Sequence, residues 1–262
     1  MNSAVSGKLA VVTGASSGLG ADIATVLAER GCNLVLVARS QDKLQSLRER
    51  LHRDCGVTVE IVPLDLSQAD APARLHGMVT ARGFNVDFLV NNAGLGAVGP
   101  FSAMNWERDE QMINVNIRAL HQLTRLFLAD MLASGQGRIL NVASVAGFQA
   151  IPYFSTYAAT KAYVLSLSEA LHAELAGTDV KVSALCPGAT RTAFWDVAGG
   201  GSNRVLNFRM MDCRAVAEYG VALMLSGRPV GVPGLMNKLM ILLRRFVPRS
   251  WAAAVTAAVM KE

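Results

Sequence analysis

The chain has 262 residues, of which 52% are apolar and 17% are charged, with a net charge of +5 and a mean hydropathy of +0.31. Intrinsic disorder is excluded, because this composition offers far more apolar surface for burial than disordered segments have. A membrane-spanning helix is not expected either, since no window approaches the roughly 18 uncharged apolar residues that one requires.

The cysteines show no disulfide or metal-binding pattern. Cys32, Cys55, Cys186 and Cys213 are widely spaced, with no CxxC pair and no histidine at a zinc spacing. No export signal precedes the first apolar run, which begins at Leu9. We therefore expect reduced thiols, no metal ion and a cytoplasmic location.

Short apolar runs alternate with longer amphipathic stretches between residues 9 and 186. This alternation is typical of βα units, and nearly continuous apolar strands are typical of a parallel sheet covered on both faces. Strands are predicted at 9–13, 34–38, 58–63, 86–91, 138–143 and 180–186. Helices are predicted at 18–30, 41–53, 69–82, 106–132 and 157–176. Because no linker or repeat interrupts the series, the sequence predicts one α/β domain over 1–262, doubly wound and Rossmann-type, with its core at 8–187.

The remaining residues, 188–262, follow a different pattern. Gly199, Gly200, Gly201, Ser202 and Asn203 indicate a loop or lid within 188–213. A helix at 215–225, a strand at 230–232 and two apolar helices at 235–246 and 251–260 are predicted after it. Basic residues gather in this quarter, namely Arg204, Arg209, Arg214, Lys238, Arg244, Arg245 and Arg249. We interpret them as a solvated rim, with attraction of anionic ligands or of a membrane surface as the alternative.

A glycine-rich turn joins the first strand to the first helix. It contains Gly14, Ser16, Ser17, Gly18, Leu19 and Gly20, in the spacing G-x-x-x-G-x-G. Such a turn lets the backbone approach a pyrophosphate, whose charge the N–H groups at the helix N-terminus can bind. The turn therefore indicates a dinucleotide site.

The end of the second strand indicates which dinucleotide binds. NAD-preferring folds place an acidic residue there for the ribose 2′-hydroxyl, whereas an arginine suits a 2′-phosphate. This chain has Arg39, followed by Ser40, which can add a hydroxyl donor. We therefore predict NADP(H) as the preferred cofactor.

Three further residues have the chemistry that carbonyl reduction needs. Tyr157 and Lys161 are four residues apart in a predicted helix, so they share one face. Ser144 follows the strand at 138–143, at the carboxyl edge where doubly wound folds bind ligands. Hydride transfer to a ketone leaves negative charge on oxygen, so the site must polarise that oxygen and supply a proton. Tyr157 is predicted as the acid, Ser144 as the hydrogen-bond donor, and Lys161 as a cation that lowers the pKa of the phenol.

Taken together, these motifs resemble the short-chain dehydrogenase/reductase family from residue 8 to about residue 192. The resemblance also includes Asp65 and Leu66, the Asn91-Asn92-Ala93-Gly94 turn, Asn116, and Pro187-Gly188 with Thr190 and Thr192. It implies that Asp65 and Leu66 hold the adenine, that Asn92, Ala93 and Gly94 lie along the cofactor, and that 187–192 hold the nicotinamide. It further implies that Lys161 binds the ribose hydroxyls and that Asn116 anchors a water for proton transfer.

Several functions and partners remain open at this point. The first is an NADP(H)-dependent oxidoreductase acting on an apolar small ketone. Alternatives are a 3-oxoacyl reductase that meets a carrier or coenzyme A through Arg191, Arg204 and Arg209, a catalytically silent NADP-binding regulator, and a nucleotide-sugar epimerase. The longer substrate domain of the epimerases is absent from the sequence. We expect a homodimer or homotetramer, no nucleic-acid partner, and weak peripheral membrane contact of the C-terminal tail as a further option.

Overall fold

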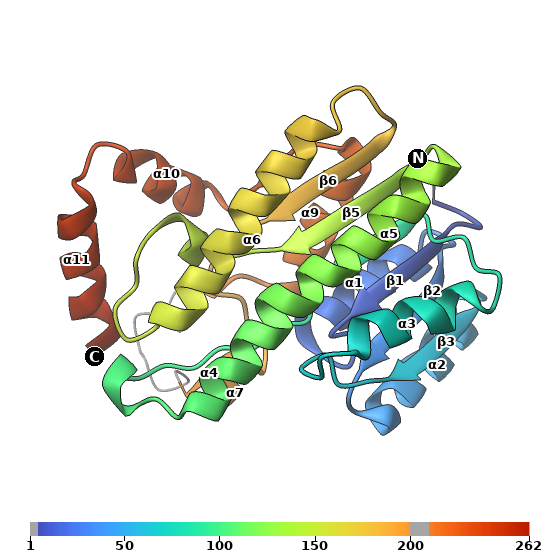
Figure 1. Ribbon diagram of the computed structural model, residues 1–262, viewed down its shortest axis with the longest axis horizontal. Coiled ribbons are helices and arrows are strands. Elements are labelled where there is room, and N and C mark those ends of the chain that lie inside the picture. The colour runs from blue at the N-terminus through green and yellow to red at the C-terminus, as the bar shows by residue number, and fades with distance from the viewer. Residues whose placement is uncertain (1–4, 200–209, 262) are drawn as a thin grey trace.

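Seven parallel strands form one sheet, in the order β3-β2-β1-β4-β5-β6-β7, in the computed structural model, which describes residues 5–199 and 210–261. The strands are β1 (Leu9–Thr13), β2 (Asn33–Ala38), β3 (Val59–Pro63), β4 (Phe88–Asn91), β5 (Gly137–Val142), β6 (Val180–Leu185) and β7 (Val230–Gly231). Their central residues are buried on both faces, which explains the uninterrupted apolar runs. The expected doubly wound α/β domain is thus confirmed (Figure 1).

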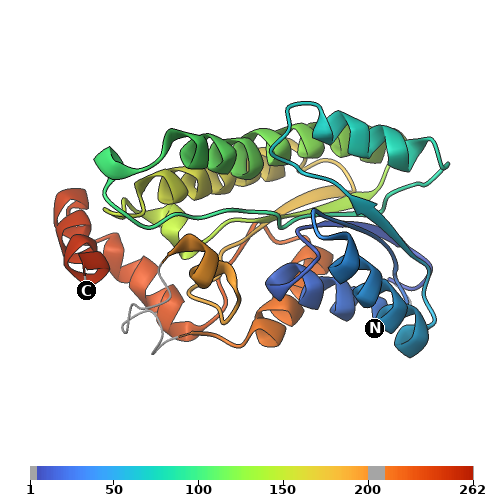
Figure 2. The same ribbon diagram turned by 90° about the horizontal axis from the view of Figure 1, so that it is seen from below.

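Helices cover both faces of this sheet (Figure 2). Helices α1, α2 and α9 cover one face, and α3, α5 and α6 cover the other. Their bounds are α1 (Gly18–Ala28), α2 (Gln41–Cys55), α3 (Ala71–Thr80), α5 (Leu120–Ser134), α6 (Ser155–Glu174) and α9 (Cys213–Ser226). The strand order reverses between β1 and β4, and at such a switch point the crevice at the carboxyl ends of the strands binds ligands.

The long helix expected at 106–132 is divided into three parts. It consists of α4 (Trp106–Ile113), a π-helical turn η2 (Asn114–Ala119) and α5. The wider turn adds a residue to the local helical repeat, which apolar periodicity does not reveal. Asn116 lies in this turn, so the departure from a regular helix falls on a predicted site residue.

The segment expected as a loop at 188–213 has regular structure in its described part. It contains α7 (Phe194–Ala198) and a bridge that pairs Thr190 with Met211. The residues Gly200, Gly201, Ser202, Asn203, Arg204 and Arg209, on which the lid and the carrier contact were predicted, lie outside the described residues.

Two helices extend from one end of the sheet after β7. They are α10 (Leu235–Arg244) and α11 (Arg249–Lys261), and both lie at the left-hand end of the molecule in Figures 1 and 2. Short 3-10 helices η1 (Phe101–Ala103) and η3 (Val145–Phe148) complete the fold. Over the described residues, no helix has the length and apolar character needed to cross a bilayer.

Candidate active site

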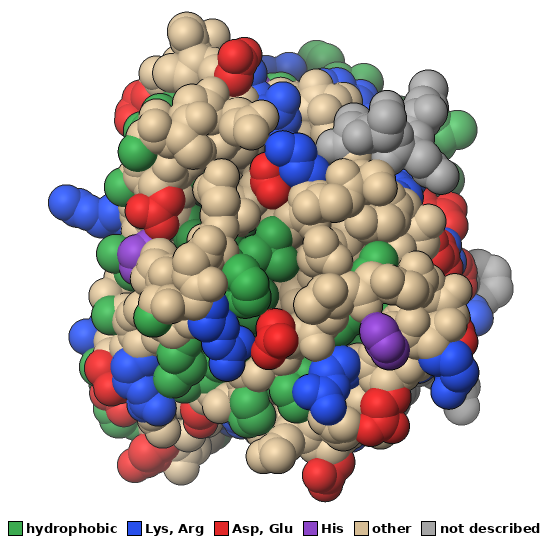
Figure 3. Space-filling model, turned by 90° about the vertical axis from the view of Figure 1, so that its right-hand side faces the viewer, with side chains coloured by type: hydrophobic (Ala, Val, Ile, Leu, Met, Phe, Trp, Pro, Cys, Tyr) green, Lys and Arg blue, Asp and Glu red, His purple; other side chains and the backbone are tan. Residues whose placement is uncertain are grey.

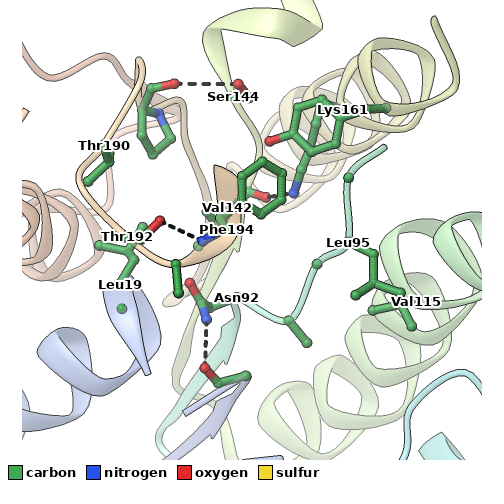
Figure 4. A pocket seen from close by; sticks show the side chains of 18 of the residues that line it. Leu19, Asn92, Leu95, Val115, Val142, Ser144, Lys161, Thr190, Thr192 and Phe194 are labelled. Atoms are coloured by element: carbon green, nitrogen blue, oxygen red, sulfur yellow. Dashed lines mark hydrogen bonds between the residues drawn. The ribbon is translucent and has the colours of Figure 1, made fainter. Parts of the chain in front are cut away.

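A cavity of about 420 Å³ runs along the carboxyl ends of β1 to β6 (Figure 4). Nearly all predicted site residues line it: Gly14, Ser16, Ser17, Gly18, Leu19, Arg39, Ser40, Asp65, Leu66, Asn92, Ala93, Gly94, Ser144, Tyr157, Lys161, Pro187, Gly188, Thr190 and Thr192. Gly20 and Asn116 are absent from this lining. The topology therefore brings residues from six strand ends into one cleft.

The glycine-rich turn leaves the N-terminus of α1 open to an anion. Ser17 is the N-cap of α1, but its side chain makes no capping hydrogen bond, and no acidic residue lies in the first turn. The backbone N–H groups there thus keep their capacity for an anion. Gly14 and Gly18 have φ of +66° and +55°, a conformation that glycine adopts without strain.

Gly20 acts through close packing. A Cβ on Gly20 would lie 2.3 Å from the carbonyl oxygen of Gly14 and 2.4 Å from Nδ2 of Asn92. That amide donates to the carbonyl oxygen of Thr13 at 3.0 Å, which ties the loop after β4 to the end of β1. Gly20 and Asn92 therefore shape the cleft from behind, and Asn92 also lines it.

The adenosine end of the cleft is the region around Arg39. Arg39 and Ser40 are exposed there, and Arg39 forms no ion pair with any described residue. Ser40 is the N-cap of α2 but makes no side-chain capping bond, so its hydroxyl stays available. Oδ1 of Asp65 accepts from the backbone N–H of Ser67 at 2.9 Å, a local turn that holds this carboxylate at the cleft. An arginine, a free hydroxyl and a helix N-terminus along one cleft fit a phosphorylated dinucleotide.

Tyr157, Lys161 and Ser144 meet at the other end of the cleft. Nζ of Lys161 lies 5.7 Å from the centroid of the Tyr157 ring and donates to the carbonyl oxygen of Val142 at 2.7 Å (Figure 4). Ser144 caps η3, where its hydroxyl accepts from the N–H of Ala146 at 3.1 Å. The close packing of η3 on α6 requires Gly147, because a Cβ there would lie 2.7 Å from the carbonyl oxygen of Lys161.

Burial dominates the ionisation of both titratable groups. It raises the pKa of Tyr157 to about 12, while a hydrogen bond with Ser144 acts in the opposite direction. Burial lowers the pKa of Lys161 to about 8. The lowering of the phenol pKa that we expected from Lys161 is therefore not found, because the cost of burying a phenolate outweighs the effect of this cation.

Asn116 is a positioning residue in the structure. Its Oδ1 accepts from the N–H of Leu95 at 2.8 Å, and its Nδ2 donates to the carbonyl oxygen of Leu95 at 2.9 Å and to Oγ1 of Thr160 at 3.0 Å. These bonds clamp the loop after β4 to α6. They use the side-chain amide fully, so the water-anchoring role implied by the resemblance stays a prediction.

An aromatic wall around Tyr157 was not predicted from the sequence. It consists of Phe154, Phe194 and Trp195, whose ring centroids lie between 4.3 and 5.8 Å from their neighbours in the cluster. Helix α7 is held over the cleft by a bond from the N–H of Val98 to the carbonyl oxygen of Ala198 at 2.8 Å. The adjacent aromatic pair at 194–195, directly after Thr192, was the available signal.

Comparison with known proteins supports this geometry. Residues 8–199 match the family model described as short chain dehydrogenase. An uncharacterized oxidoreductase of Staphylococcus aureus (strain MRSA252) is 36% identical over 186 residues, which are 71% of this chain and 79% of the relative. A 7beta-hydroxysteroid dehydrogenase of Clostridium sardiniense is 31% identical over 189 residues, or 72% of each chain.

Two solved structures are similar over almost the whole chain. A short-chain dehydrogenase from Sphingobium yanoikuyae in complex with NADPH has a TM-score of 0.80 and 32% identity, with 92% of this chain and 96% of that chain covered. A short-chain dehydrogenase/reductase from Burkholderia phymatum in complex with NAD has a TM-score of 0.83 and 28% identity, with 92% and 94% covered. The fold is thus one that binds nicotinamide cofactors of both kinds.

Proposed function

The chain belongs to the short-chain dehydrogenase family, and on that premise we propose that it is an NADP(H)-dependent oxidoreductase that interconverts a ketone and a secondary alcohol. One observation carries the proposal. Tyr157, Ser144 and Lys161 line the same cleft as the glycine-rich turn and Arg39. The groups for proton transfer and the groups for cofactor binding therefore belong to one site.

In the proposed reduction, NADPH supplies the hydride and the protein supplies the proton and the position of the carbonyl. The phenol of Tyr157 donates its proton to the carbonyl oxygen, and its raised pKa keeps it protonated at neutral pH. The hydroxyl of Ser144 donates a hydrogen bond to the same oxygen. An ammonium has three N–H donors, and Lys161 uses one on Val142, so the others can bind the ribose hydroxyls and stabilise the phenolate.

Arg39 and Ser40 support NADP(H) over NAD(H). A guanidinium binds a 2′-phosphate by charge-assisted hydrogen bonds, and the free hydroxyl of Ser40 adds a donor. The NADPH complex of the Sphingobium yanoikuyae relative agrees with this preference, although the Burkholderia phymatum relative binds NAD. Arg39 is therefore the feature of this chain on which the preference depends.

The aromatic wall supports a lipophilic carbonyl substrate. Phe154, Phe194 and Trp195 surround Tyr157 with apolar surface, and Ile151 and Met260 line the same end of the cleft. A flat apolar ketone fits such surroundings better than a sugar or a small acid. The hydroxysteroid activity named for the Clostridium sardiniense relative points to the same class.

The proposal is tested by NADPH absorbance with a panel of carbonyls. We expect oxidation of NADPH with hydroxysteroid-type and bulky aryl ketones, and slower reaction with 3-oxoacyl-coenzyme A. NADPH without a carbonyl is the control for uncoupled oxidation. Binding of NADPH without turnover of any ketone would instead identify a silent regulator, and would overturn the proposal.

We further propose a homo-oligomer that pairs through α5 and α6. A hollow of about 300 Å³ between these helices is lined by Leu128, Leu132, Leu167 and Leu171, and Leu132 is 45% exposed. Leu120, Leu123, Phe127 and Leu175, which the sequence also offered for pairing, pack inside the protomer. Sedimentation of Leu132→Glu should show a smaller species than the wild type, and equal species would contradict the pairing.

The state of the cysteines supports the cytoplasmic location proposed for the protein. Cys32, Cys55, Cys186 and Cys213 are all free thiols, as proteins of a reducing compartment have them. Thiol titration of protein isolated under alkylating conditions should therefore recover four reduced cysteines; a disulfide would contradict this location.

A further inference from the structure

Helix α10 and the turn after it present apolar side chains to the outside in two parallel rows. Both rows have the spacing i, i+4, i+7 and i+11, which places their members on one side of a helix. The first row is Leu235, Leu239, Leu242 and Phe246, and the second is Met236, Met240, Leu243 and Val247. Their exposed fractions range from 41% for Val247 to 84% for Leu235, and no residue of α10 is buried.

The opposite side of α10 faces the protein with a polar residue. Nδ2 of Asn237 donates to the carbonyl oxygen of Pro233 at 2.9 Å and to Sδ of Met211 at 3.4 Å. Asn237 also seats on Gly188, where a Cβ would lie 2.5 Å from Nδ2. These contacts fix the orientation of the helix. The usual arrangement of a surface helix, apolar inside and polar outside, is therefore reversed here.

The charges of this region have one sign. Residues 235–261 contain five basic residues, Lys238, Arg244, Arg245, Arg249 and Lys261, and no acidic residue. Lys238 and Arg245 are seven residues apart, and the helical repeat places both beside the first apolar row. By contrast, Figure 3 shows positive and negative side chains interspersed at the other end of the molecule.

Helix α11 extends the same apolar surface. Trp251 and Val255 lie on one side of it and are 69% and 65% exposed. Its other side faces the protein, where Thr256 donates to the carbonyl oxygen of Ala150 at 3.3 Å and Met260 joins the cluster around Tyr157. Tryptophan is favoured at membrane interfaces because its ring is apolar and its N–H is polar.

We propose that α10 and α11 form a surface that docks on a bilayer of anionic lipid. Apolar rows flanked by lysine and arginine are the pattern of helices that lie in the interface plane. At about 1.5 Å per residue, α10 is far too short to cross the hydrocarbon core. A second copy of the chain is the less favourable occupant, because a two-fold contact would bring two surfaces of the same positive charge together.

Docking in this way would place the apolar end of the cleft next to the bilayer. Met260 lines the cleft from α11, and Asn237 joins α10 to the loop at Gly188. Resting on the proposed function, this position would let a ketone dissolved in lipid enter the site without crossing bulk water. The surface would then also favour membrane-dissolved substrates over water-soluble ones.

Vesicle co-sedimentation of the full chain tests the docking surface. The probes are vesicles of phosphatidylcholine alone and vesicles in which about a third of the lipid is phosphatidylglycerol. We expect the wild type to bind only the anionic vesicles, and less so in about 1 M salt, where charges are screened. Lys238→Glu with Arg245→Glu should lower the partition about thirtyfold or more, at about fivefold for each basic residue lost.

A second double variant, Leu239→Glu with Phe246→Glu, tests the apolar rows and should also abolish binding. Met78→Glu is the matched control, since Met78 is 40% exposed on α3, far from this surface, and it should bind as the wild type does. All these side chains are exposed, so melting temperatures should not change.

Absence of wild-type binding, or equal binding by every variant, would overturn the proposal. So would an oligomer in vesicle-free solution that Leu239→Glu with Phe246→Glu dissociates, because a second copy would then cover the surface. The measurement uses neither cofactor nor ketone. A failure of the proposed oxidoreductase activity would therefore leave its result intact, and the two failures are distinguishable.

Discussion

The ring of Phe154 stacks on the ring of Tyr157, with the centroids 4.3 Å apart and the planes 22° from parallel. Phe154 is 3% exposed, so the stack holds the phenol of Tyr157 against a fixed surface. Phe154→Leu keeps an apolar side chain but removes the stack. We expect kcat to fall about tenfold, because the proton donor loses its fixed position. Phe88→Leu, the same change in a buried residue of β4, is the control; equal kcat values for the two variants would contradict the role of the stack.

Gly96 makes room for the ring of Phe194. A Cβ on Gly96 would lie 2.5 Å from Cζ of Phe194, and this ring lies 5.4 Å from that of Tyr157. Gly96→Ala should displace the ring and raise KM for a bulky ketone about tenfold, with little change in KM for NADPH. Phe194→Ala should have the same selective effect. Gly77→Ala is the matched control, because a Cβ at Gly77 meets nothing within 4 Å. An increase in KM for NADPH alone would show that the ring serves the cofactor instead.

Arg39 should determine the choice between NADPH and NADH. Arg39→Asp replaces a phosphate-binding cation by the carboxylate that NAD-preferring folds carry at this place. We expect kcat/KM for NADPH to fall about a hundredfold and kcat/KM for NADH to rise, as measured by steady-state kinetics with both cofactors. Arg53→Asp, at the other end of α2, should leave the ratio of the two values unchanged. An unchanged ratio for Arg39→Asp would refute the assignment.

The sheet and most of the cleft were predictable because they depend on local signals. Apolar runs gave the strands within a few residues, and the turns after them carry the residues that line the cleft. Asn116 was identified, but its clamp on Leu95 was not, since a π-helical turn leaves no mark in apolar spacing. The aromatic wall depends on α7 folding back over the loop after β4, a long-range contact that no local pattern encodes.

Ionisation was the other feature that the sequence did not predict. The spacing of Tyr157 and Lys161 indicated a cation beside a phenol, but it gave no measure of burial. In the structure both groups are buried, and this reverses the expected direction of the phenol pKa. Whether a charge is stabilised thus depends on the solvent that the fold excludes, which is a property of the packed site.

The stability of the protein should depend on pH through Lys161. Burial lowers the pKa of Lys161 from 10.5 to about 8, so the folded state carries the full cost of a buried cation below about pH 8. Between about pH 8 and 10.5 the unfolded chain binds more protons at this group than the folded chain, and the free energy of unfolding therefore rises with pH. Lys161→Met should lack this rise.

Urea denaturation of the wild type and of Lys161→Met at about pH 7 and pH 10 measures the effect. The difference between the two proteins is the relevant quantity, because Cys32, Cys186 and Cys213 also titrate at alkaline pH and contribute to both. We expect this difference to shift in favour of the wild type as the pH rises. Lys43→Met, an exposed lysine of α2, should show no such shift, and a shift in the opposite direction would contradict the burial of the Lys161 cation.

The central claim is that Tyr157 transfers the proton in carbonyl reduction, and single-turnover oxidation of bound NADPH by Tyr157→Phe tests it most directly. Tyr163→Phe is the control, since Tyr163 is on the same helix but its hydroxyl pairs with His121 outside the cleft. We predict that Tyr157→Phe binds NADPH as the wild type does but oxidises it at least about a hundredfold more slowly, the usual effect of losing a general acid. A rate for Tyr157→Phe close to that of Tyr163→Phe would contradict the claim.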